Sequence, residues 1–130
     1  MQTSSFDNDR FSAKNAMTLV EVEEGYARAQ MIVGEDHLNA LSIPHGGVYF
    51  SLADFAFGAA IDYVNNSAVT LNAAIDFIKS ATPGDTVTAY ARQKQTSRRI
   101  IRGDVDLYDQ NDDLLATVHF NNYRRTSATS

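Results

Sequence analysis

The chain has 130 residues, 44% of them hydrophobic and 21% charged, which suits one globular domain with a hydrophobic core. The net charge of −5 argues against a protein that binds nucleic acid, because such a protein needs a cationic face. The chain has no cysteine, and its three histidines form no HxxxH or HxH pair, so neither disulfides nor a metal site are expected.

The first 15 residues are predicted to form a helical lead-in, with Phe6, Phe11 and Ala13 as the side chains that dock it on the domain. They carry acids and no apolar core of the kind found in signal peptides, so we do not interpret them as one. Residues 126–130 are expected to be a frayed tail. The main domain is therefore predicted to span residues 16–125.

The next 50 residues are predicted to form two strands, a loop and one long helix. Met17–Val33 has near alternation of apolar residues on either side of a turn at Glu23–Gly25. A loop is expected over Gly34–Pro44, followed by a helix over Gly46–Asn65. This helix is apolar almost all round, and a helix of that kind is enclosed by other structure.

The second half of the chain is predicted to form four strands, over Val69–Ile78, Thr86–Thr96, Arg99–Tyr108 and Leu114–Tyr123. Strands, one long buried helix and then consecutive antiparallel strands indicate an α+β fold. We expect one antiparallel sheet wrapped around the helix. Such a sheet leaves its edges open, and a second subunit that extends the sheet would cover them.

The longest apolar stretch, Val48–Val64, is interrupted by Ser51, Asp54 and Asp62. Acids are costly in lipid, so this stretch is not expected to span a membrane. We therefore expect a cytoplasmic protein that does not associate with membranes.

Asp54 lies well inside this apolar helix, with Phe50, Ser51, Phe57 and Gly58 as its helical neighbours. No lysine or arginine lies within a turn or two, so no local ion pair offsets the burial of its charge. An acid in such a place is a candidate functional residue. The alternative is that Asp54 lies on a thin solvated stripe of the helix.

His45-Gly46-Gly47 precedes the helix. Two glycines let a ligand approach the backbone, and the unpaired amides of a first helical turn can stabilise a developing oxyanion. The alternative is a glycine-rich helix entry that only eases packing. Gly46 and Asp54 are separated by about two helical turns, or ~12 Å. One chain therefore cannot bring both to one carbonyl group, and a neighbouring subunit must supply one of them.

Five segments stand in this order along the chain: Asn39, five residues later His45-Gly46-Gly47, then Asp54, Ala74-Ile75-Asp76-Phe77 and Thr82-Pro83-Gly84-Asp85. Together they resemble the signature of the hotdog-fold acyl-CoA thioesterases of the phenylacetic-acid-degradation type. The resemblance extends from about Gly25 to Arg125.

This resemblance implies a hotdog fold, an enzyme that hydrolyses acyl-CoA to free acid and CoA, and a homodimer or homotetramer with active sites between subunits. It implies that Asp54 acts as general base or nucleophile and that the Gly46 amide polarises the thioester carbonyl. Asn39 is expected near the leaving group or the attacking water. A structural role for His45, which orients the loop beside Gly47, is the alternative to a substrate contact.

Thr70 falls where the resemblance places a hydroxyl residue that holds the water, although an ordinary strand threonine is equally plausible. Asn72, two residues further on, is expected to share the face of Thr70 and to be its substitute. No cofactor is expected, because CoA is part of the substrate. Its phosphates need local cations on an acidic protein, and Arg98, Arg99 and Arg102 are the candidates. The competing interpretation is that these arginines balance Asp104 and Asp106 nearby.

Three other functions remain open. The first is a hotdog module that binds acyl-CoA without hydrolysing it, and Asp54 in register with the motif argues against it. The second is a hotdog hydratase or dehydratase, which usually relies on a histidine paired with an acid. The third is a purely structural dimer, which leaves Asp54 without a role.

Overall fold

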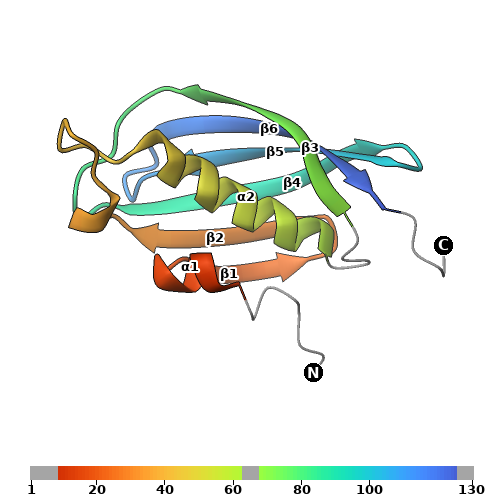
Figure 1. Ribbon diagram of the computed structural model, residues 1–130, viewed down its shortest axis with the longest axis horizontal. Helices are drawn as coiled ribbons and strands as arrows, with labels where there is room; N and C mark the ends of the chain where they lie inside the picture. The colour runs from red at the N-terminus through yellow and green to blue at the C-terminus, as the bar shows by residue number, and fades with distance from the viewer. Residues whose placement is uncertain (1–8, 63–67, 126–130) are drawn as a thin grey trace.

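The computed structural model describes residues 9–62 and 68–125. One six-stranded antiparallel sheet carries one long helix on its face, as Figure 1 shows. The helices are α1 (Arg10–Lys14), the 3-10 turn η2 (Glu35–His37) and α2 (Gly46–Asp62). The strands, in the order in which they lie side by side, are β1 (Thr18–Glu23), β2 (Tyr26–Ile32), β4 (Thr86–Thr96), β5 (Ile100–Tyr108), β6 (Leu114–Arg124) and β3 (Ala68–Phe77). The predicted α+β architecture is confirmed.

The core lies between α2 and the inner face of the sheet. Alanines on β2 and β4 face the helix and are fully buried, which lets α2 approach the sheet closely. Phe57 of α2 stacks on Phe120 of β6 with 5.1 Å between ring centroids. Gly103 of β5 has no room for a side chain, because the Phe57 ring occupies that space. This contact fixes the rotation of α2 about its axis and hence the direction in which Asp54 points.

The lead-in differs from the prediction in one respect. Asp9 caps α1 by accepting a hydrogen bond from the Ser12 amide at 3.0 Å, and Ser12 is the residue that α1 buries. Phe11 is 61% exposed and Ala13 is exposed as well, so the prediction that they dock on the domain is wrong for the single chain. The loop before α2 also contains η2, which the sequence did not predict. Phe6, the predicted end of the long helix and the frayed tail lie outside the described residues.

Strand β3 is an edge of the sheet and is open on both faces. Val69, Leu71 and Phe77 are each between 44% and 57% exposed, although most strands of this sheet bury alternate residues. An edge strand with exposed apolar side chains favours pairing with another chain. Within the described ranges, no helix is long and apolar enough to cross a membrane.

Candidate active site

The side chain of Asp54 projects from the one open face of α2. Its neighbours Ala53 and Phe55 are buried, whereas Asp54 itself is exposed in the single chain. Thr70 of β3 donates a hydrogen bond from its hydroxyl to Asp54 Oδ1 at 3.4 Å. The chain therefore brings two of its predicted site residues together, from a helix and from an edge strand.

The pKa of the Asp54 carboxyl is raised above its usual range. Partial desolvation of the carboxyl by the protein is the largest cause. The hydrogen bond from Thr70 acts in the opposite direction, because it stabilises the ionised form, and the charge of Asp9 adds a further small increase. A raised pKa makes the Asp54 carboxylate a stronger base than an ordinary aspartate.

Thr70→Val should shift the acidic limb of the kcat–pH profile to higher pH. Valine keeps the shape of the side chain but removes the hydrogen bond that lowers the pKa of Asp54. Activity that needs the ionised carboxylate then requires a higher pH. The measurement is kcat for thioester hydrolysis across the acidic range. Thr70→Ser, which keeps the hydroxyl, is the matched control, and identical limbs in both variants would contradict the assignment.

The start of α2 leaves one backbone amide unused. The Gly47 N–H donates to His45 Nδ1 at 3.0 Å and the Val48 N–H donates to the His45 carbonyl at 2.9 Å. The Gly46 N–H has no acceptor among residues 9–62 and 68–125. His45 Nδ1 accepts a hydrogen bond, so a neutral ring carries its proton on Nε2. An unpaired amide at a helix start is suited to bind an oxyanion.

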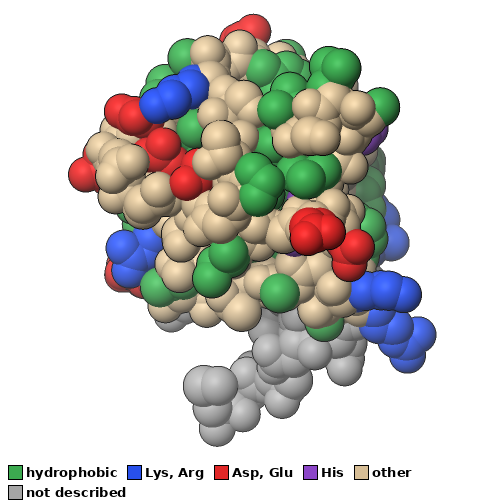
Figure 2. Space-filling model, turned by 90° about the vertical axis from the view of Figure 1, so that its left-hand side faces the viewer, with side chains coloured by type: hydrophobic (Ala, Val, Ile, Leu, Met, Phe, Trp, Pro, Cys, Tyr) green, Lys and Arg blue, Asp and Glu red, His purple; other side chains and the backbone are tan. Residues whose placement is uncertain are grey.

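The ring of Phe77 in β3 lies beside Gly46. A Cβ atom at Gly46 would lie 3.0 Å from Phe77 Cζ, which is tighter than ordinary contact. Phe77 also meets Tyr49 of α2 edge to face, with 6.0 Å between ring centroids. Figure 2 shows hydrophobic side chains at the end of the molecule where α2 begins, and the exposed apolar residues there include Leu41, Ile43 and Phe77. A ligand on the Gly46 amide would therefore lie against an apolar wall.

Asn39 shapes the loop that leads into α2. Its Oδ1 accepts hydrogen bonds from the Leu41 amide at 2.8 Å and the Ile43 amide at 3.4 Å. The His45 amide donates to the His37 carbonyl at 2.8 Å, which ties the loop to the helix start. These two amides occupy the side-chain oxygen Oδ1 of Asn39, and the side-chain NH₂ group remains available as a donor.

Asn72 does not share the face of Thr70, so that prediction is wrong. The register of β3 against β6 shifts between these residues, and Thr70 lies opposite Asn122 whereas Asn72 lies opposite Asn121. Consecutive residues of β6 point to opposite faces, so Thr70 is on the inner face and Asn72 on the outer face. There the Asn121 side chain donates to Asn72 Oδ1 at 2.9 Å. Asn72 therefore cannot replace Thr70 beside Asp54.

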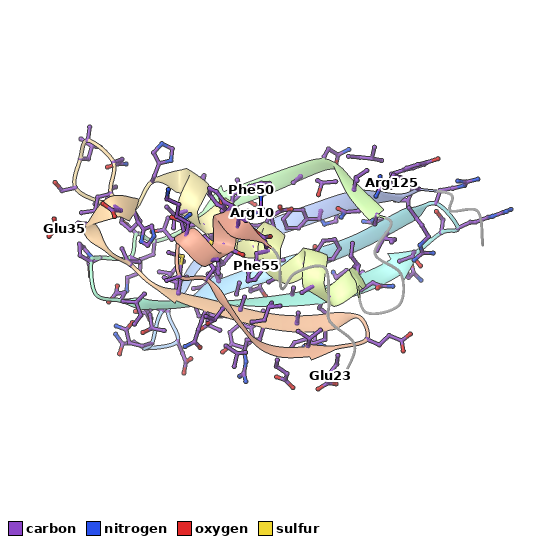
Figure 3. All side chains as sticks on the ribbon, turned by 60° about the horizontal axis from the view of Figure 1, so that its bottom comes forward. Arg10, Glu23, Glu35, Phe50, Phe55 and Arg125 are labelled. Atoms are coloured by element: carbon purple, nitrogen blue, oxygen red, sulfur yellow. The ribbon has the colours of Figure 1, made fainter. Side chains whose placement is uncertain are left out.

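Arg98 and Arg99 lie at the β4–β5 hairpin, at the opposite end of the sheet from the start of α2 (Figure 1). Figure 3 shows the same separation, because Arg125 after β6 and Glu35 in the loop before α2 lie at opposite ends. Arg99 Nη1 donates to the Tyr123 hydroxyl at 3.4 Å, and Arg98 is exposed. In one chain these arginines are therefore far from Gly46.

A charged network on the outer face of the sheet has no counterpart among the predictions from the sequence. Asp104 of β5 lies 2.7 Å from His119 Nδ1 and, through its other oxygen, 2.7 Å from Lys94 Nζ. Burial acts to raise the pKa of Asp104, but the hydrogen bonds from Lys94 and His119 outweigh it and lower the pKa. Alternation along the strands predicts that Asp104 and His119 lie on the same face of the sheet. No signal in the sequence predicts that Asp104 pairs with both His119 and Lys94. The described part of the chain has no group of three potential metal ligands.

Comparison with known proteins identifies the fold. A family model described as thioesterase superfamily matches residues 42–116. The acyl-coenzyme A thioesterase PaaI of Escherichia coli is 29% identical over 119 residues, which cover 92% of this chain and 85% of that protein. A relative from Archaeoglobus fulgidus is 35% identical over 88 residues, 68% of this chain, and the match spans 57% of that protein.

Two solved structures agree with these matches. The structure of E. coli PaaI, from the phenylacetic acid degradation operon, superposes with a TM-score of 0.86 and covers 92% of this chain and 91% of that one. The structure of smu.793 from Streptococcus mutans, bound to acetyl CoA, superposes with a TM-score of 0.78 at 26% identity and covers 85% of this chain and 90% of that one. The predicted hotdog fold is confirmed.

Proposed function

The chain belongs to the thioesterase superfamily, and on that premise we propose that it hydrolyses acyl-CoA thioesters to free acid and CoA. The observation that carries this proposal is the Asp54 carboxylate with its raised pKa, held by Thr70 on the open face of α2. The name of the E. coli relative and the acetyl CoA bound to the S. mutans relative support the substrate class.

The chemistry requires one base and one oxyanion donor. In the direct route, Asp54 takes a proton from water while the water oxygen attacks the carbonyl carbon, and the Gly46 N–H stabilises the oxyanion. The C–S bond then breaks, and the proton passes to the sulfur of CoA. In the covalent route, the Asp54 carboxylate attacks the carbonyl carbon, the C–S bond breaks and CoA leaves as its thiolate, which takes up a proton. Water then hydrolyses the resulting mixed anhydride to the free acid and restores the Asp54 carboxylate. No separate cofactor takes part in either route.

The site is composite, with Gly46 and Asp54 supplied by different subunits. Two antiparallel α2 helices related by a two-fold axis bring the Gly46 amide of one subunit opposite Asp54 of the other. The open faces and exposed apolar side chains of β3 support a dimer formed along this strand. A composite site requires a homodimer, either alone or paired into a homotetramer. We further propose a cytoplasmic location.

The loop before α2 completes the site from the same subunit as Gly46. The Asn39 NH₂ group is available to the sulfur of CoA or to the attacking water. His45 holds the Gly47 amide and presents Nε2–H outward. These contacts orient the helix start and leave the Gly46 amide as the donor to the thioester.

The antiparallel arrangement of the two α2 helices also places Arg98 and Arg99 where they could bind the phosphates of CoA. The partner's helix begins near Asp54 and runs away from the β4–β5 hairpin, so the loop that precedes it extends toward Arg98 and Arg99. A CoA molecule with its thioester at Asp54 then has its phosphates near this hairpin. Arginine suits phosphate because its planar fork donates to two oxygens.

Arg98→Gln combined with Arg99→Gln should raise KM for acyl-CoA several-fold and leave kcat nearly unchanged. Contacts with the phosphates are equal in the ground and transition states, so their loss affects binding alone. The control is a short thioester that lacks the nucleotide, for which KM should not change. An unchanged KM for acyl-CoA would mean that the phosphates bind elsewhere.

The proposed function is tested by free-thiol release from a panel of acyl-CoAs with aryl, short and medium acyl chains. Hydrolysis of at least one member supports the proposal, and the panel also identifies the acyl group. Tight binding of acyl-CoA with no thiol release from any member would instead make the protein a binding module.

A further inference from the structure

Asn122 is a buried polar residue on the inner face of β6, and it is only 4% exposed. It follows Phe120 on the face that packs against α2. The other buried polar residues of the described chain, Ser12 and Asp109, have hydrogen bonds that account for their burial. The Asn122 Oδ1 atom is buried and has no donor among the described residues. A buried acceptor is normally hydrogen-bonded, and water is the usual partner where no protein donor is present.

Arg124 lies two residues further along β6 on the same face, and it has an unpaired donor where Asn122 has an unpaired acceptor. Its Nε atom is buried and has no acceptor among the described residues. It lines an open pocket of about 930 Å³ together with Ala60 and Ile61 of α2. The Cα atoms of residues two apart on a strand lie about 7 Å apart. Side chains that lean toward each other can therefore bring their polar atoms within the ~6 Å that one water with two hydrogen bonds spans.

Thr70 connects this pair to Asp54. It lies directly opposite Asn122 on the neighbouring strand, where Cβ atoms are about 4.5–5.5 Å apart. The one hydroxyl proton of Thr70 is donated to Asp54, so its oxygen can only accept from other groups. Thr70 therefore cannot satisfy Asn122 Oδ1 directly, and a third group must lie between them.

We propose that Asn122 and Arg124 hold water behind Thr70 and that this water supplies the hydrolysis at Asp54. One water accepts from Arg124 Nε–H and donates to Asn122 Oδ1 and Thr70 Oγ1, which is the usual number of bonds for a buried water. Each turnover consumes one water, and the pocket at the end of α2 replaces it while acyl-CoA occupies the open face. The inference rests on the proposed function. Asn122 is a positioning residue within it, because it acts through water.

Asn122→Leu should lower kcat about 10-fold or more while KM changes less than about 2-fold. Leucine has a similar volume and no polar atom, so it removes one partner of the water. Loss of the water leaves Arg124 Nε–H without an acceptor, so the melting temperature should fall modestly together with kcat. A merely structural role predicts a different pattern, a lower melting temperature at normal kcat. Asn122→Ser, with room for a second water, should recover part of kcat.

Asn121→Leu is the matched control, because it changes the adjacent residue on the outer face and should leave kcat near wild type. Arg124→Met removes the Nε donor at similar side-chain length, and it provides a second test if Asn122→Leu does not fold. Its kcat should fall with KM unchanged. A rise in KM at normal kcat would overturn the proposal and make Arg124 a coenzyme contact.

The proposed function and the water site can fail separately. If the wild type releases no thiol from any acyl-CoA, the proposed function fails. If the wild type is active and Asp54→Asn is inactive, but Asn122→Leu and Arg124→Met both keep wild-type kcat, only the water site is overturned.

Discussion

Asp54→Asn should lower kcat for acyl-CoA hydrolysis by at least ~100-fold, whether Asp54 acts as base or as nucleophile. Asparagine has the same shape, but it neither accepts the proton of water nor attacks the carbonyl carbon. It can still accept the hydrogen bond from Thr70, so the position of β3 is retained. The measurement is free-thiol release at saturating substrate.

The substitution should not destabilise the protein. The pKa of Asp54 is raised by burial, so the folded state holds the carboxyl proton more tightly than the unfolded chain does. The stability from this group is fully present below the unfolded pKa and is lost as pH rises through the folded pKa. At neutral pH the ionised carboxylate therefore lowers stability, and asparagine removes that effect. A folded Asp54→Asn protein with unchanged kcat would refute the catalytic role.

Gly46→Pro should lower kcat about 100- to 1,000-fold, the usual effect of losing one oxyanion donor. Proline is tolerated at the first position of a helix, where it removes the N–H and keeps the backbone angles. Gly46→Ala is the matched control, because its Cβ meets Phe77 in the same way but the N–H remains. Phe77 is 57% exposed, so its ring can move aside in both variants. Equal activity in the two variants would exclude the amide as the donor.

Mixing the two inactive proteins tests the composite site. A hybrid of one Asp54→Asn subunit and one Gly46→Pro subunit contains one intact site and one site with both defects. Random reassociation of equal amounts should therefore restore about a quarter of the wild-type activity. If both residues acted from the same subunit, every site in the hybrid would carry a defect, and activity would stay at the level of the separate variants.

The sequence predicts most of this fold because its signals are local. Alternation locates the strands, and the apolar run after Pro44 locates α2. The same alternation along β6, continued past Phe120, places Asn122 among the inward-facing residues, and a polar residue in that row is the signal that sequence reasoning missed. Phe11 shows the limit of pattern alone, because a helix of five residues is too short to establish which side faces the domain.

The site was less predictable because it depends on pairing between distant strands. The contact of Thr70 with Asp54 and the placing of Asn72 on the other face both follow from the register of β3 against β6. Simple alternation puts residues two apart on one face, and no local signal marks the shift between them. The link between Lys94, Asp104 and His119 likewise depends on how three strands align.

The irregularity between Thr70 and Asn72 makes β3 tolerant of change at one position. Leu71, the extra residue within it, is 55% exposed, so many side chains are compatible with that position. Deleting Leu71 would leave Thr70 opposite Asn122 and Asn72 opposite Asn121 in regular pairing, so Thr70 would stay on the inner face beside Asp54. The codon for Leu71 is thus one that the gene could change or lose without separating the helix from the sheet at the reacting carboxylate.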